Sequence, residues 1–356
     1  MGTSFHFLDF TLRDIPDPLS HVSHIISYSD RKFNHETSSA NFLRTRFFNN
    51  RFKSKLFKSK KNFPPISRVQ PIYGKALFFD FKVLSHPLLI GTIKTNYDKI
   101  QFAKIIDDYL WVLGVSTLAR FDIGSFQRSE QQRIEPKLLI KHRLLAGCHS
   151  FEILGNSIFV SSSGCEGVLE FNSDTGELAN TFLFKGYKLA RSYRVSQTTD
   201  LTKNYITNDF QKFHLNSVTI AQNRIYFSTL SGLIGYFDRE TSRLRIIANG
   251  YVGIHSLKFD KEQKHLHFIS SANGEFFCLD VDGIVLKKFQ IDSKWVQGAR
   301  AFKSCGCIIF CDTYSNKIVV TSGLHNERSI ELSLDEFGIG GPLFVTESEI
   351  GIGRNA

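Results

Sequence analysis

The chain has 356 residues, 42% of them hydrophobic, and contains 34 Phe and 11 Tyr but a single Met. That length suffices for a large buried core, and the aromatic content favours β-structure over a helical bundle. No run of about 18 uncharged apolar residues occurs, which excludes a transmembrane helix. The formal net charge of +10 belongs to one segment, because ten basic residues and no acidic one lie between Glu36 and Asp80.

The N-terminus carries Asp9, Asp14 and Asp17 where a secretory signal has a basic stretch followed by an apolar one. Six cysteines are few for this length, so we expect a cytoplasmic protein with reduced thiols. Cys305 and Cys307, followed by Cys311, resemble half of a metal knuckle. No second pair or nearby histidine completes it, and the strand-like surroundings favour structural thiols.

Residues 1–65 lack a sustained period, end in Phe63-Pro64-Pro65, and carry the basic cluster interleaved with phenylalanines. We expect a basic N-terminal extension with one short helix around 40–57, followed by the main domain over 66–356. The extension has no recognised nucleic-acid motif, so a solvated tail or an arm that docks to a protein partner is favoured over nucleic-acid binding.

From about residue 100 the chain repeats one unit: a polar opening, a short apolar run, a turn, and two further runs of β-branched and aromatic residues. The polar segments that begin four of the repeats contain His149, His214, His255 and Arg300, which lie 65, 41 and 45 positions apart. This spacing is close to the roughly 40 to 50 residues of a β-propeller blade. In four repeats the third run ends at an Asp or Asn, namely Asp122, Asn172, Asp238 and Asp280, whose side chains can cap the turn that follows.

Five such repeats are evident, and two half-repeats remain at opposite ends of the chain. They cover 76–90 near the start and 343–352 near the end. Pairing of the first and last strands would complete a sixth blade and remove both open sheet edges. The predicted fold is therefore an all-β propeller, with six four-stranded blades and a basic N-terminal extension.

The first strand of every propeller blade lines the central channel, so the polar openings are expected to meet around one axis. His149, His214, His255 and Arg300 are the predicted catalytic residues, with Asn216 directly behind as a substrate contact. Such a ring could hold a divalent metal through neutral imidazoles, bind an anion, or carry out acid–base or nucleophilic chemistry. A single histidine at a strand start is more often a satisfied polar residue than a ligand.

The connection from Gly186 to Phe213 is longer than a crossing between blades needs, and it leads directly into His214. We expect it to cover the same mouth of the channel. Its candidate substrate contacts are Arg191, Tyr193, Arg194 and Asp209. The alternative interpretation is a surface decoration.

The phrases around His214, His255 and Arg300 resemble a bacterial family of uncharacterised six-bladed propeller proteins over roughly residues 100 to 350. More distantly, the ring of histidines and an arginine is similar to that of the aryl-sulfate sulfotransferases. The resemblance implies a shared channel location, and for the sulfotransferases transfer of a sulfuryl group.

Two classes of function follow. One is a channel site that binds or transforms a small anionic substrate in a transferase or lyase reaction, with His214 or His255 as base or nucleophile and Arg300 stabilising negative charge. The other is a non-catalytic scaffold that presents a face to a protein partner. Imidazoles converging on one accessible point favour the enzyme, whereas imidazoles each satisfied by protein groups favour the scaffold.

Overall fold

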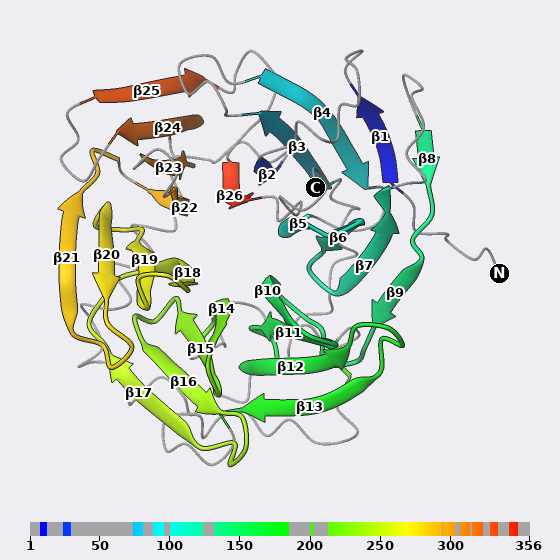
Figure 1. Cartoon of the computed structure of the whole chain (residues 1–356), viewed down its shortest axis with the longest axis horizontal. Helices are drawn as coiled ribbons and strands as arrows, with labels where there is room; N and C mark the ends of the chain where they lie inside the picture. The colour runs from blue at the N-terminus through cyan, green and yellow to red at the C-terminus, as the bar shows by residue number, and fades with distance from the viewer. Residues whose placement is uncertain are drawn as a thin grey trace, which may run out of the picture.

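The computed structural model describes residues 8–12, 24–29, 74–80, 88–95, 100–123, 132–184, 200–201, 213–293, 295–302, 307–313, 315–322, 328–333 and 342–347. They form an all-β structure in which the sheets stand around a central axis (Figure 1). This part of the chain contains no helix long and apolar enough to cross a membrane. The expected helix at 40–57 lies outside the described residues.

Five blades have four strands each, with the first strand nearest the axis and the last on the rim (Figure 1). The first blade contains β5 (Phe102–Ile106), β6 (Tyr109–Leu113), β7 (Thr117–Asp122) and β9 (Leu138–Lys141). The second contains β10 (Cys148–Leu154), β11 (Ser157–Ser162), β12 (Gly167–Asn172) and β13 (Leu178–Leu183). The third contains β14 (Leu215–Ala221), β15 (Arg224–Thr229), β16 (Ile234–Asp238) and β17 (Leu244–Ala248).

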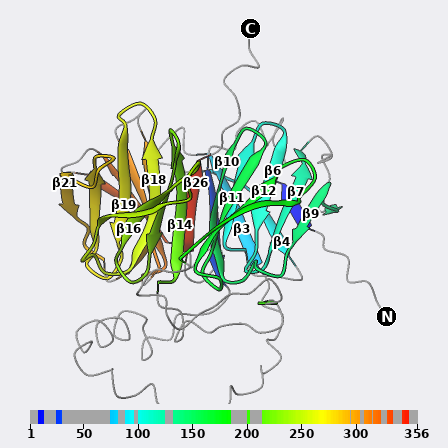
Figure 2. The ribbon, with the colours of Figure 1, turned by 90° about the horizontal axis from the view of Figure 1, so that it is seen from below.

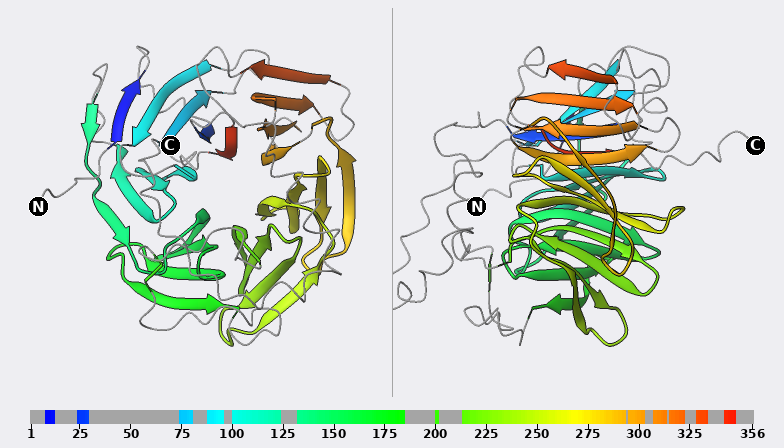
Figure 3. Two further views of the ribbon diagram at one scale, coloured as in Figure 1. Left: turned by 180° about the vertical axis from the view of Figure 1, so that it is seen from behind. Right: turned by 90° about the vertical axis from the view of Figure 1, so that its left-hand side faces the viewer.

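The fourth blade contains β18 (Ile254–Asp260), β19 (His265–Ser270), β20 (Glu275–Leu279) and β21 (Val285–Gln290). The fifth contains β22 (Val296–Phe302), β23 (Cys307–Asp312), β24 (Lys317–Ser322) and β25 (Arg328–Ser333). Seen from the side, inner strands such as β10, β14 and β18 stand along the axis (Figure 2). The same ring of sheets is seen from behind in Figure 3.

The remaining strands form one six-stranded sheet, here called the closing sheet, in the order β26-β2-β3-β4-β1-β8. Its members are β26 (Pro342–Glu347), β2 (His24–Ser29), β3 (Gly74–Asp80), β4 (Leu88–Thr95), β1 (Leu8–Leu12) and β8 (Gln132–Ile134). The prediction of six four-stranded blades is therefore wrong: five blades have four strands. The two predicted half-repeats do enter one sheet, but β2 lies between them.

Strands β1 and β2 come from the segment 1–65 that the sequence assigns to an extension, and both pair within the closing sheet. The reason is that antiparallel pairing needs only a short run of residues with free backbone groups, which a weak side-chain pattern does not reveal. The basic residues between 44 and 61 lie outside the described residues.

The hydrophobic core lies between neighbouring sheets. Phe159 and Phe182 of the second blade pack with Phe227 and Phe237 of the third, and all four are almost fully buried. The middle strands are therefore buried on both faces, whereas the rim strand β21 is largely exposed. The stability of the fold comes from the packing of each sheet against the sheets on either side of it.

The turns confirm the predicted capping in three of the four repeats. Asn172 Oδ1 accepts the backbone N–H groups of Asp174 and Thr175, both at 2.9 Å. Asp238 Oδ1 accepts the N–H of Thr241 at 2.8 Å, and Asp280 Oδ1 accepts the N–H of Ile284 at 2.8 Å. A short side-chain acceptor after the third strand thus closes the turn to the rim strand in three successive blades.

Removal of β26 should destroy the cooperative unfolding of the chain. This strand pairs with β2 and contacts the inner strands β22 and β5 on either side. A variant lacking 342–356 loses that junction, and the expected loss is comparable with the stability of a whole domain, about 5 to 15 kcal/mol. Thermal and denaturant unfolding measure it. The control is a variant lacking only 348–356, and equal melting of both shortened chains would contradict the closure.

Candidate functional site at the central axis

The innermost strands of the five blades can be compared position by position if the residues of each strand are counted back from the hairpin at its end. The last residues, Ile106, Leu154, Ala221, Asp260 and Phe302, each pair with the first residue of the following strand. Residues the same number of positions before these ends therefore occupy equivalent places in successive blades.

Two sets of equivalent positions carry polar side chains. Five positions before the end lies what we call the amide–imidazole tier: Gln101, His149, Asn216, His255 and Gln297. Two positions before the end lies what we call the charged tier: Lys104, Glu152, Thr219, Lys258 and Arg300. Register shifts occur in β10, β14, β18 and β22. A bulge adds one residue, so side chains three positions apart come to the same side of the strand.

The charged tier meets at the axis. Lys104 Nζ donates to Glu152 Oε1 at 3.2 Å, and Lys258 Nζ donates to Glu152 Oε2. Glu152 belongs to the second blade and Lys258 to the fourth, with the third blade between them. A direct contact between blades that are not neighbours requires both side chains to reach across the axis.

The electrostatics of this tier are coupled. Burial of Lys258, together with the positive charges of Lys104 and Arg300, lowers the pKa of Lys258 to about 8, although Glu152 opposes the shift. Burial alone would raise the pKa of Glu152, but the charges and hydrogen bonds of the two lysines hold it well below its usual range. Glu152 therefore remains a carboxylate at neutral pH, although only 13% of its side chain is exposed.

The structure corrects the register assumed for two predicted site residues. His214 precedes β14 and has φ +51°, like Gly147 at +59° and Gly253 at +66° in the neighbouring blades. Backbone N–H groups donate to the carbonyls of all three residues in the same way. His214 is thus equivalent to these glycines, and Asn216 is the residue equivalent to His149 and His255. Arg300 lies in the charged tier, three residues further along its strand.

His149 and His214 nevertheless come together, with ring centroids 4.7 Å apart. His214 is buried, and His149 is half-buried. A left-handed backbone is uncommon for a residue with a side chain and costs of order 1 kcal/mol. Glu166 helps to fix it, because its Oε1 accepts the backbone N–H of Phe213 at 2.7 Å.

His255 has partners at both ring nitrogens. Its Nδ1 lies 3.0 Å from the carbonyl of Gly253 and 2.8 Å from Ser271 Oγ, and its Nε2 lies 3.3 Å from Asn216 Nδ2. Since a carbonyl only accepts, Nδ1 carries the proton and Nε2 accepts from the amide. Burial lowers the pKa of His255 to about 4, so the ring is neutral at pH 7.

The amide–imidazole tier also contains buried acceptors. Asn216 is fully buried, and its Nδ2 donates to the carbonyl of Ile254 at 2.8 Å. Its Oδ1, like Gln297 Oε1, has no hydrogen-bond partner in the part of the chain that the structure describes. Buried acceptors of this kind are rare and call for a donor.

The other predicted site residues, Arg191, Tyr193, Arg194 and Asp209, lie outside the described residues. Among the described residues, the histidines of the inner strands do not form a group of three ligand atoms close enough for a metal ion. Sequence reasoning missed Lys104, Glu152 and Lys258. All three lie two residues before the hairpin that ends their strand. Aligning the repeats on these hairpins, instead of on the histidines, would have shown this shared position.

No family model matches the chain, and no curated protein sequence matches it. Neither the uncharacterised six-bladed family nor the sulfotransferases is therefore supported by sequence. Similar folds are common among solved structures, with 1353 matching chains. One is a chain in the crystal structure of a nidogen/laminin complex, with a TM-score of 0.54 and 11% identity over 78% of this chain and 96% of that one. At this identity the likeness shows the β-propeller fold alone.

Replacing Glu152 by Gln should destabilise the protein by about 3 kcal/mol at pH 7, because it leaves the buried Lys104 and the partly exposed Lys258 without their carboxylate. Since the pKa of Glu152 is lowered in the folded state, its contribution is fully present above the ordinary carboxyl value of 4.5 and declines as the pH falls below it. Denaturant unfolding should show the difference between wild type and variant shrinking from pH 7 to pH 3.

The control is the exposed carboxylate Glu177, whose replacement by Gln should change stability by less than about 0.5 kcal/mol. A Glu152→Gln protein as stable as wild type at pH 7 would contradict the axial ion pairs.

Proposed function

We propose that this propeller binds a small anion at the charged tier, in a central channel lined by both tiers. The observation that carries the proposal is the sharing of Glu152 by Lys104 and Lys258, with Arg300 at the equivalent position of the next blade. The tier thus brings the cations Lys104, Lys258 and Arg300 close to one another. A bound anion would lower the electrostatic cost of holding these cations together.

The amide–imidazole tier extends the binding surface. Asn216 Oδ1 and Gln297 Oε1 are acceptors, so they suit a ligand with hydroxyl or amine donors. The two tiers are three residues apart across a bulge, which separates them by roughly 7 to 10 Å. A small, hydroxylated anion is therefore the substrate class that this arrangement supports best.

A transferase or lyase reaction would need a group that moves a proton beside this anion. His149 and His214 support that role, because their rings lie together and His149 belongs to the tier next to the charged tier. His255 supports it less, since both of its nitrogens are engaged and its pKa is about 4. Arg300 would stabilise negative charge on the ligand.

A second candidate function is a scaffold for a protein partner. It is favoured by three exposed apolar residues in succession, Ile284, Val285 and Leu286, which lead into the rim strand β21. An edge strand with exposed apolar side chains suits pairing with another chain. The nidogen/laminin structure is itself a complex between proteins. The basic segment 44–61 is a further candidate arm for such a partner.

The anion proposal predicts that full-length protein binds inorganic sulfate or phosphate at low ionic strength. Removing one charged hydrogen-bond partner, as in Lys258→Met, should weaken binding about tenfold or more. Because the pKa of Lys258 is about 8 in the free protein and a bound anion raises it, binding at pH 8 should take up protons. Affinity should fall as the pH rises from 7 to 9. Calorimetry in buffers of different ionisation enthalpy measures both effects.

The matched control is Lys261→Met, which removes an exposed lysine from the hairpin that follows β18 and should leave binding unchanged. Folded Lys258→Met and Arg300→Met variants that bind sulfate and phosphate like wild type would overturn the anion proposal. The rim surface at β21 would then be the remaining candidate.

A further inference from the structure

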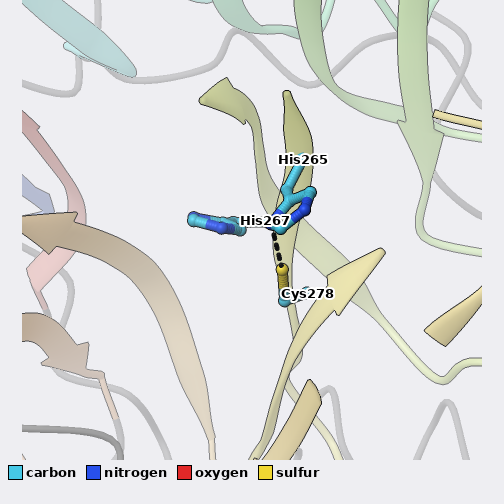
Figure 4. Close-up of side chains that lie close together, drawn as sticks. All are labelled: His265, His267 and Cys278. Carbon is cyan, nitrogen blue, oxygen red and sulfur yellow. Dashed lines mark hydrogen bonds between the residues drawn. The ribbon is translucent and has the colours of Figure 1, made fainter. Parts of the chain in front are cut away.

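Away from the axis, the fourth blade brings two histidines and a cysteine together (Figure 4). His265 and His267 lie on β19, and Cys278 lies on β20. One ligand atom from each residue lies within 4.8 Å of the other two. His265 Nδ1 is 3.4 Å from Cys278 Sγ, the hydrogen bond drawn in Figure 4.

The strand register produces this convergence. Residues two apart on a strand face the same side, so His265 and His267 project together. His267 pairs with Cys278 across β19 and β20, which places the thiol on that same face. The intervening Leu266 packs on the opposite face, against the third blade.

The face that holds the cluster is directed toward the fifth blade. His267 contacts the ring of Phe276 at a centroid distance of 5.6 Å, and Phe276 in turn contacts Phe310 of β23. Cys278 is buried, whereas both histidines are partly exposed. The cluster is thus packed against the ring of Phe276, and its histidines can be reached from solvent, as binding of an ion requires.

The donor set fits a zinc-class cation. Zinc lies about 2.3 Å from thiolate sulfur and about 2.0 to 2.1 Å from imidazole nitrogen, so tetrahedral ligand atoms are about 3.4 to 3.6 Å apart. The sulfur and Nδ1 of His265 already have this separation. Small side-chain rotations would bring the second imidazole to the same distance. Two imidazoles and one thiolate are borderline-soft ligands, which disfavour magnesium and calcium.

Charges of both signs lie near the thiol of Cys278. Burial raises the pKa of Cys278, the nearby Lys287 lowers it, and the nearby Asp260 raises it further. A metal bound to this sulfur would displace the thiol proton. Asp260 pairs with His265 across β18 and β19 and adds negative charge beside the cluster.

We propose that His265, His267 and Cys278 form a binding site for a divalent cation of the zinc class, separate from the axial anion site. Three protein ligands leave a coordination position for water or an external ligand. The two sites use different strands of the same blade, so the metal site stands whether or not the axis binds an anion. Its pH dependence is the opposite of the anion site's, because rising pH removes the protons that compete with the metal.

The test is a titration of reduced, chelator-treated, full-length protein with Co²⁺, which substitutes for zinc and reports its ligands by absorption. We expect one equivalent to bind, with a thiolate-to-cobalt charge-transfer band and the visible bands of tetrahedral cobalt. Zn²⁺ should displace it and bleach the spectrum. Binding should release a proton and should tighten as the pH rises from 6 to 8.

Cys278→Ser should abolish the charge-transfer band. His265→Gln and His267→Gln should each weaken binding at least tenfold, the size of effect that loss of a residue orienting a ligand already causes. The matched control is Cys165→Ala, which removes another buried thiol whose sulfur donates to the carbonyl of Ser162. It should leave the titration unchanged.

Absence of the charge-transfer band at saturating Co²⁺ would overturn the proposal. So would a band that survives in Cys278→Ser and disappears in a Cys305→Ser and Cys307→Ser double variant, since other thiols would then hold the metal. If Cys278→Ser fails to fold, as judged by near-ultraviolet circular dichroism, the two histidine variants decide: an unchanged affinity in both would equally refute the site.

Discussion

The carboxylate of Glu152 links the inner strands of three blades: its own second blade, the first and the fourth. It accepts from Lys104 of the first blade and from Lys258 of the fourth, past the intervening third blade. A buried ion pair contributes to stability only when its geometry satisfies both partners. Each blade must therefore present its inner strand at the right height and angle, which ties the arrangement of the propeller to the chemistry at its centre.

Much of the blade architecture is predictable from the sequence because its causes are local. Alternating apolar residues and short turns act within each repeat, and in three blades the side chains of Asn172, Asp238 and Asp280 cap the turn after the third strand. The closing sheet is less predictable because its cause is long-range. Strand β26 pairs with β2, more than 300 residues earlier in the chain, and no local pattern specifies that partner.

At the axis, the sequence locates the polar residues of the inner strands but does not show which of them occupy equivalent positions in successive blades. The histidine phrases point to the beginning of the inner strands, where His149, His255 and Asn216 do lie in one tier. His214 has a left-handed backbone and occupies the position held by Gly147 and Gly253, whereas Arg300 lies two residues before its hairpin and so belongs to the charged tier. Backbone conformation and bulges depend on how two strands pair in the folded protein, so a short sequence motif does not predict them.

The most direct test of this account is a double-mutant cycle between Glu152 and Lys258, which lie 106 positions apart in the sequence. Denaturant unfolding at pH 7 of wild type, Glu152→Gln, Lys258→Met and the double variant gives their coupling free energy. The account predicts a favourable coupling of at least about 1.5 kcal/mol, within the range for residues in direct contact. Effects that add to within about 0.5 kcal/mol, as for distant residues, would contradict it.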